Sequence, residues 1–277
     1  MTYSLFCCIA ALMLLAACSS PSQRFDQTAL DHGFNKIEIE GSGFTHAAFE
    51  NGKLGTAETL HVYLGGDGTP WIGGFIIASD PTPRRPVALK LMALDGFPSL
   101  FLGRPCYHGQ SKRQPCTSDY WTSERYSKDV IDTMAEALRK VMNDYGHTDL
   151  RLIGFSGGGS LAMLLAQRFP ETRAIVTIAG NLDIESWVAL HSYDPLDGSL
   201  NPKSIPALPA AVRQYHLAGG RDENIPPAII RDALINQPDI QFILFEDFTH
   251  GCCWEGVWPA LLACVENQCD WAAAKQP

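Results

Sequence analysis

The stretch Arg151-Leu-Ile-Gly-Phe-Ser-Gly-Gly-Gly159 decides the fold. It begins as an apolar strand and continues into a tight turn of the pattern Gly-x-Ser-x-Gly. The mostly apolar residues 160–169 then predict a buried helix. The serine of such a turn has a strained backbone, with which side chains two positions away would collide. Gly154 and Gly158 occupy those two positions. The order of strand, turn and helix therefore favours a nucleophilic Ser156 over a purely structural glycine turn.

Strand-like and helical segments alternate on both sides of this turn. Residues 36–40 alternate in polarity, residues 87–94 follow Pro86 as a helix would, and residues 127–145 have the apolar spacing of an amphipathic helix. Further strand-like runs are residues 60–64, 99–102, 150–155, 174–179, 212–218 and 241–245, most of them apolar on both faces. This alternation predicts an α/β fold with a doubly wound, mostly parallel sheet.

Composition limits the classes of function. The chain has 277 residues, of which 46% are hydrophobic and 18% charged, and this excludes disorder, collagen-like repeats and a coiled coil. The formal net charge is -9. Because such a surface repels phosphate backbones, no nucleic-acid partner is expected.

The first residues are predicted to be an export signal. Residues 5–17 are uncharged and almost wholly apolar, but the run is shorter than the roughly 20 residues that cross a bilayer as a helix. Its end, Leu15-Ala-Ala-Cys18, resembles the lipobox of bacterial lipoproteins. That resemblance implies a signal peptide at residues 1–17, an acylated Cys18 and, because Ser19 is not aspartate, an outer-membrane location facing the periplasm. An ordinary signal peptide is the alternative. The mostly polar residues 18–35 are predicted to be a tether.

The cysteines agree with export. Six of the nine remain once Cys7 and Cys8 leave with the signal and Cys18 carries lipid. An even number in an oxidising compartment predicts disulfides, and the absence of a repeated Cys-x-x-Cys pair disfavours zinc. One local bridge and two C-terminal bridges are expected. The first joins Cys106 to Cys116, and the others join Cys252 and Cys253 to Cys264 and Cys269 in either order.

A second glycine-rich loop, Gly65-Gly-Asp-Gly68, follows the strand-like run 60–64. Such a loop allows a backbone N–H to face a reacting carbonyl group. We predict that the Asp67 N–H and the Gly157 N–H, the latter at a helix N-terminus, form an oxyanion hole. Gly66 permits the conformation of Asp67, whose carboxylate has no acid–base role. A glycine turn without a catalytic donor is the alternative.

An acid and a base are expected after later strands. Asp222 follows the run 212–218 and is predicted to orient a histidine and to stabilise its charged form. Asp183, after the preceding strand, is the rival acid, and Glu223 is a spare. His250 follows the last strand and can accept the serine proton and return it to the leaving group. His216 lies within a strand and is expected to be part of the core.

The order Ser156, Asp222, His250 and the turn Gly-Phe-Ser-Gly-Gly-Gly resemble the α/β-hydrolase superfamily, over residues 36–271. Exported bacterial hydrolases, often lipoproteins, are similar in the loop at residues 63–68 and in the stretches at residues 103–106 and 180–183. The resemblance implies an α/β-hydrolase domain at residues 36–277 with an insert at about residues 182–210, after the sixth strand of the fold. It also implies acyl-enzyme hydrolysis of an ester, thioester or amide without a metal or organic cofactor.

The leading hypothesis is a serine esterase or lipase-like enzyme that acts on a small-molecule acyl substrate through Ser156. A peptidase or amidase of the same fold is one alternative. A catalytically silent lipoprotein that binds a ligand or partner is another. The insert, with Trp187, His191 and Tyr193, is predicted to shape the pocket, unless it is a surface excursion without substrate contact. The oligomeric state stays open.

Overall fold

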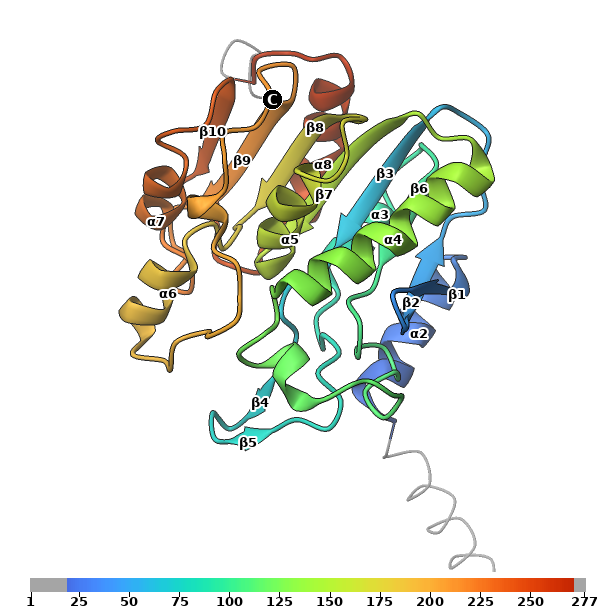
Figure 1. Cartoon of the computed structure of the whole chain (residues 1–277). Coiled ribbons are helices and arrows are strands. Elements are labelled where there is room, and N and C mark those ends of the chain that lie inside the picture. Colours follow the sequence, from blue (N-terminus) through green and yellow to red (C-terminus); the bar gives the residue numbers. More distant parts are fainter. Residues whose placement is uncertain (1–18, 272–277) are drawn as a thin grey trace, which may run out of the picture.

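The computed structural model describes residues 19–271 and builds them around a sheet of eight strands (Figure 1). The order across the sheet is β1-β2-β6-β3-β7-β8-β9-β10. β1 and β2 pair antiparallel, β2 also pairs antiparallel with β6, and all pairs from β6 to β10 are parallel. The strands are β1 (Asn35–Gly41), β2 (Phe44–Glu50), β3 (Thr59–Leu64), β6 (Ser99–Leu102), β7 (Asp149–Phe155), β8 (Thr172–Ile178), β9 (Arg213–Gly219) and β10 (Ile240–Phe245).

Helices cover both faces of the sheet (Figure 1). One core contains buried side chains of α4, α5 and α7 together with Leu60, Val62 and Leu64 of β3, and the other contains side chains of α2, α3 and α8 together with Tyr63 of the same strand. Successive side chains of a strand point to opposite faces, so a single strand contributes to both cores. The helices are α2 (Pro21–Asp31), α3 (Val87–Met92), α4 (Lys128–Tyr145), α5 (Gly157–Ala166), α6 (Ile184–His191), α7 (Pro227–Ala233) and α8 (Trp254–Glu266), with short 3₁₀ turns η1 (Ser118–Trp121) and η2 (Pro202–Ser204).

This architecture confirms the predicted doubly wound, mostly parallel sheet, with residues 182–210 lying after its sixth strand in chain order. The sequence did not indicate β2 or the small hairpin of β4 (Trp71–Ile72) and β5 (Ile76–Ile77), which pair only with each other. Helix α5 begins at Gly157, three residues earlier than predicted, because the serine turn leads directly into it. Among residues 19–271, no helix is both long enough and apolar enough to span a membrane.

The predicted tether at residues 18–35 is wrong for residues 21–31, which form α2. Ser20 caps this helix in a capping box with Gln23, and Pro21 occupies its first turn. Phe25 and Ala29 lie four residues apart on one face and are buried in the core. The overall polar composition concealed this two-residue apolar stripe.

The disulfides are partly as expected. The structure pairs Cys106 with Cys116, as predicted, but it also pairs Cys252 with Cys253 and Cys264 with Cys269. The predicted C-terminal connectivity is therefore wrong. Helix α8 starts directly after Cys253 and separates it from Cys264 by 11 positions, about 16 Å at 1.5 Å per helical residue. That separation is too large for a disulfide, so each pair closes locally.

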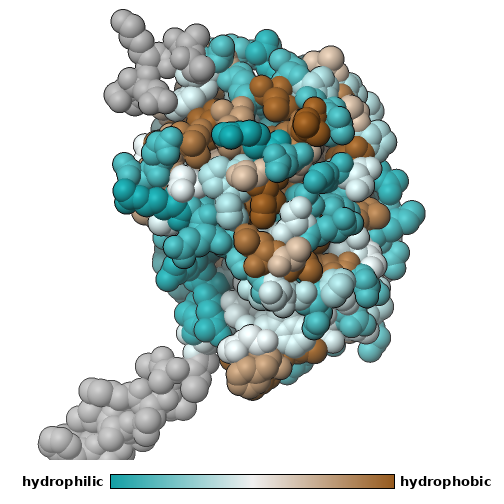
Figure 2. Space-filling view, turned by 90° about the vertical axis from the view of Figure 1, so that its left-hand side faces the viewer, coloured by the Kyte–Doolittle hydropathy of each residue, from teal (hydrophilic) through white to brown (hydrophobic). Residues whose placement is uncertain are grey.

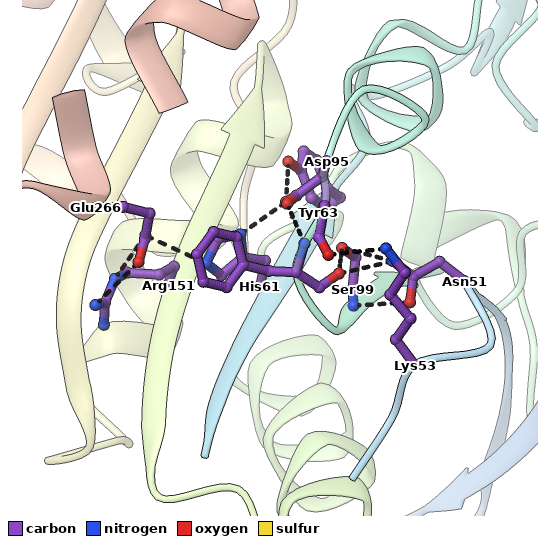
Figure 3. A network of polar contacts seen from close by, with 10 residues as sticks. Asn51, Lys53, His61, Tyr63, Asp95, Ser99, Arg151 and Glu266 are labelled. Carbon is purple, nitrogen blue, oxygen red and sulfur yellow. Dashed lines mark hydrogen bonds and ion pairs between the residues drawn. The ribbon is translucent and has the colours of Figure 1, made fainter. Parts of the chain in front are cut away.

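A buried polar network connects β3 with α8 and with the segment after α3 (Figure 3). The His61 Nδ1 atom lies 2.7 Å from Asp95 Oδ2, and its Nε2 atom lies 3.2 Å from Glu266 Oε1. Tyr63 donates to Asp95, and Arg151 of β7 donates to Glu266. Burial alone would lower the pKa of His61, but the two carboxylates outweigh burial and raise it. In its protonated form, His61 pairs with carboxylates of both segments and so connects α8 to the sheet.

Candidate active site

Ser156 lies at the turn between β7 and α5, with φ 55° and ψ -124°. Left-handed φ values are uncommon for residues other than glycine, and such strain is typical of functional sites. A Cβ atom on Gly154 would lie 2.1 Å from the Gly158 carbonyl oxygen, and one on Gly158 would lie 2.1 Å from the Leu64 oxygen. Both glycines are therefore required by close backbone contacts, as the sequence pattern predicts.

Three side chains predicted from sequence come together at the carboxyl edge of the sheet. The Ser156 Oγ atom lies 3.0 Å from His250 Nε2, and His250 Nδ1 lies 2.8 Å from Asp222 Oδ2. The other oxygen of Asp222 accepts the N–H groups of Asn224 and Ile225, each at 2.9 Å. Asp222 is fully buried, whereas the His250 side chain is 26% exposed. This is a serine–histidine–aspartate arrangement with its serine end open to the cleft.

The rival candidates have other roles. Asp183 caps α6 by accepting the Ser186 N–H, and it also pairs with Lys203 at 2.7 Å. Burial would raise the pKa of Asp183, but the hydrogen bonds from Lys203 and Ser186 outweigh it and lower the pKa. Glu223 is exposed. His216 is buried in β9 beside Thr177, and burial lowers its pKa to about 3. It is a neutral core histidine, as expected.

The loop at residues 65–68 lies directly against the serine turn. A Cβ atom on Gly66 would lie 3.1 Å from Ser156 Cβ, and one on Gly157 would lie 1.9 Å from Asp67 Oδ1. Within residues 19–271, the N–H groups of Asp67 and Gly157 donate no hydrogen bond. Two unused donors beside Ser156 are what an oxyanion hole requires.

A cluster of buried charges holds this loop, and the sequence did not indicate it. The Asp67 carboxylate lies 2.8 Å from Arg104 and 3.1 Å from Arg125, and it accepts the Tyr126 hydroxyl at 2.5 Å. Burial would raise the pKa of Asp67, but the two guanidinium groups outweigh it and lower the pKa. The carboxylate therefore stays ionised and fixes the loop from behind, consistent with no acid–base role. Arg104 belongs to the noted stretch 103–106, but its partner could not be inferred from spacing.

Asn224, which the sequence did not single out, lies between the insert and the catalytic histidine. The Asn224 side-chain nitrogen lies 3.2 Å from His250 Nε2. The side-chain oxygen of Asn224 accepts from Trp187, and its backbone oxygen lies 2.8 Å from His191 Nε2. Trp187, His191 and Tyr193 form a cluster of rings with centroids 5.2 to 5.7 Å apart. Asn224 thus connects the aromatic part of the insert to the catalytic histidine.

These groups open into a cleft of about 1130 Å³. Its walls combine apolar residues with three arginines, and Ser156 and His250 lie among them. Among residues 19–271, no three His, Cys, Asp or Glu side chains are grouped to hold a metal ion. The aromatic, aliphatic and cationic residues that line the cleft include Trp71, Phe75, Arg84, Arg85, Arg125, Phe155, Trp187, Tyr193 and Leu196.

Comparisons with known proteins agree with this fold. Residues 105–218 match the family model described as alpha/beta hydrolase fold. A bacterial membrane phospholipase A is 15% identical with a TM-score of 0.60, over 96% of this chain and 99% of that one. An esterase of Pyrococcus furiosus is 11% identical with a TM-score of 0.58, over 86% and 92% of the two chains. A carboxylesterase of Bacillus subtilis is 13% identical with a TM-score of 0.52, over 90% and 96%. No curated protein sequence matches the chain.

Proposed function

We propose that this chain, which has the α/β-hydrolase fold, is a serine hydrolase that cleaves carboxylic esters through an acyl-enzyme on Ser156. One observation carries the proposal. A continuous series of hydrogen bonds runs from the buried Asp222 through His250 to the Ser156 hydroxyl, at 2.8 and 3.0 Å. Nucleophilic catalysis by serine needs a base within such reach and a third group that orients the base.

The residues have distinct roles in the proposed reaction. His250 Nε2 accepts the Ser156 proton as the oxygen attacks the ester carbonyl, and Asp222 stabilises the resulting imidazolium. The N–H groups of Asp67 and Gly157 donate to the oxyanion of the tetrahedral intermediate. His250 then gives its proton to the leaving alkoxide, which departs as an alcohol. Water, activated by the same histidine, hydrolyses the acyl-enzyme.

The choice of ester over amide rests on chemistry and on the cleft. An alkoxide can leave with little help, whereas the nitrogen of an amide must be protonated before it leaves, so an ester makes the smaller demand on a general acid. Apolar side chains such as Phe155, Trp187 and Leu196 line the cleft and suit an acyl chain. The esterases and the phospholipase that share the fold make esters the first substrates to test.

The test is a panel of p-nitrophenyl esters of increasing chain length beside the matching anilides. We expect ester turnover that falls to background in Ser156→Ala, since loss of the nucleophile removes a factor on the order of 10⁶ from kcat in a serine hydrolase. Ser123→Ala, which removes another serine of the cleft, is the matched control and should stay near the parent rate. Faster cleavage of anilides would make the chain an amidase, and undiminished turnover by folded Ser156→Ala would exclude the proposed nucleophile.

We further propose that the chain is an exported lipoprotein acylated on Cys18, a residue outside the described range. The support is the segment Leu15-Ala-Ala-Cys18 and the even number of cysteines beyond it. Radiolabelled palmitate should enter the chain in a bacterial host and should not enter Cys18→Ser. Labelling that persists in Cys18→Ser would reject this site.

A further inference from the structure

The β4–β5 hairpin presents an unusual apolar surface. Its strands pair only with each other, Trp71 with Ile77 and Ile72 with Ile76, and two glycines with positive φ form its tip. All five of its large side chains are exposed, Phe75 at 77% and Ile76 at 53%. Exposed apolar patches of this kind on soluble domains mark interaction sites. We call residues 71–77 the apolar hairpin.

The apolar hairpin lies at the mouth of the catalytic cleft. Trp71 and Phe75 line the same cleft as Ser156, so the hairpin forms part of its wall. Figure 1 shows the hairpin projecting from the lower end of the molecule. Figure 2, in which the left-hand side of Figure 1 faces the viewer, shows hydrophobic side chains at the lower end of the molecule. Whatever covers the hairpin therefore also lies beside the entrance to the site.

Two arginines line the same cleft as the apolar hairpin. Arg84 and Arg85 are exposed, line the same cleft, and have side chains without an ion pair or hydrogen bond within residues 19–271. The chain as a whole carries a net charge of -9 and would be repelled by an anionic surface. Arg84 and Arg85, which have no partner among residues 19–271, are a local exception, since they line one cleft with the exposed Trp71 and Phe75. Cationic side chains together with exposed aromatic ones are typical of an interfacial membrane-binding element.

The start of the described chain lies at the same end. The Ser22 N–H donates to Asp80 Oδ2 at 2.9 Å, and Asp80 follows the hairpin by three residues. Phe25 of α2 also lines the cleft. This contact and the place of Phe25 in the cleft wall put the N-terminal half of α2 near the segment that follows the hairpin.

We propose that the apolar hairpin docks on an anionic phospholipid surface, with its aliphatic and aromatic side chains in the interface and Arg84 and Arg85 on lipid phosphates. Partly inserted apolar side chains and nearby cations both favour such binding. Docking in this orientation places the cleft entrance at the lipid surface. The proposal does not depend on hydrolase activity or on acylation.

Hydrogen exchange of the full chain carrying Cys18→Ser tests the proposal. Exchange is measured without vesicles, with phosphatidylcholine vesicles, and with vesicles of equal parts phosphatidylcholine and phosphatidylglycerol. We expect amides 71–77 to exchange on the order of tenfold more slowly with the anionic vesicles, and less so with the neutral ones. Because the readout is local, binding through another segment cannot imitate it.

Ile76→Asp removes one apolar side chain that does not line the cleft. It should abolish the vesicle-dependent protection and leave the melting temperature near that of the parent. Ile235→Asp is the matched control, because Ile235 is 80% exposed, does not line the cleft and precedes β10, whereas the hairpin follows β3, four strands away across the sheet. It should keep the protection. If Ile76→Asp unfolds the chain, Ile76→Ser provides the same comparison.

Two results would overturn the proposal. One is unchanged exchange at residues 71–77 in the presence of anionic vesicles, whether or not the chain binds them. The other is protection that needs no vesicles and grows with protein concentration, which would assign the hairpin to a second copy of the chain. Neither result depends on turnover, so failure here is distinct from failure of the proposed serine chemistry.

Discussion

Asp222→Asn is the substitution whose effect follows most directly from the geometry. One Asp222 oxygen accepts two backbone N–H groups, from Asn224 and Ile225, and the other accepts from His250 Nδ1. An asparagine must keep its carbonyl oxygen toward the two N–H groups, because an amide NH₂ there would leave buried donors facing each other. Its NH₂ group is then forced toward His250.

That orientation changes the histidine. Facing an amide donor, His250 Nδ1 must accept a hydrogen bond, so the ring proton moves to Nε2. A protonated Nε2 cannot accept the proton of Ser156 at 3.0 Å. The expected loss in kcat is about 10⁴-fold, the effect of the same inverted tautomer in other serine–histidine–aspartate triads, or about 5.5 kcal/mol of transition-state stabilisation.

The assay is kcat for the best p-nitrophenyl ester at pH 8, beside a melting curve for each variant. Asp183→Asn is the matched control, because Asp183 is also buried but binds Ser186 and Lys203. Asp183→Asn should retain activity within about tenfold, because the loss of a helix cap affects stability more than chemistry. The reverse ranking, in two folded variants, would refute the assignment of Asp222 as the acid.

Three further predictions concern stability. Folding raises the pKa of His61, so the free energy of unfolding that its charge contributes is complete below pH 6.5 and is lost as the pH rises through the folded-state pKa. In urea unfolding, the parent should therefore be more stable than His61→Gln at pH 6, and this difference in the free energy of unfolding should be smaller at pH 9. Phe25→Ala should cost about 3 kcal/mol in the same assay, because the ring is 2% exposed, whereas Leu30→Ala, on the 65% exposed face of α2, should cost under about 0.5 kcal/mol. Asp67→Asn should cost about 3 kcal/mol and also lower kcat, since it leaves the buried Arg104 without its carboxylate; an unchanged melting temperature would deny that this pair holds the loop.

Much of the fold and site could be predicted from sequence because local signals and topology agreed. Ser156 was identified by two glycines whose absent side chains the turn requires, and Asp222 and His250 by their places after buried strands. The carboxyl ends of parallel strands meet at one edge of the sheet, so such positions converge without any sequence signal between them.

The features that the sequence did not predict depend on distant partners. Asp67 pairs with Arg104 and Arg125 across separations of 37 and 58 residues, and no periodicity encodes such a pair. The sequence predicts a tether where α2 lies, because Phe25 and Ala29 are the only apolar side chains that mark its buried face. The sequence predicts the wrong C-terminal disulfides, because proximity in sequence does not show that α8 carries Cys264 away from Cys253.

The central claim is that Ser156 is an activated nucleophile, and reaction with a fluorophosphonate tests it most directly. The intact mass of the full chain should increase by one adduct per molecule, and the adduct should lie on the peptide that contains Ser156. Labelling should be lost in Ser156→Ala and greatly slowed in His250→Ala, because the hydroxyl then lacks its base. A chain that stays unlabelled although folded, or that carries the adduct on another residue, would contradict the account.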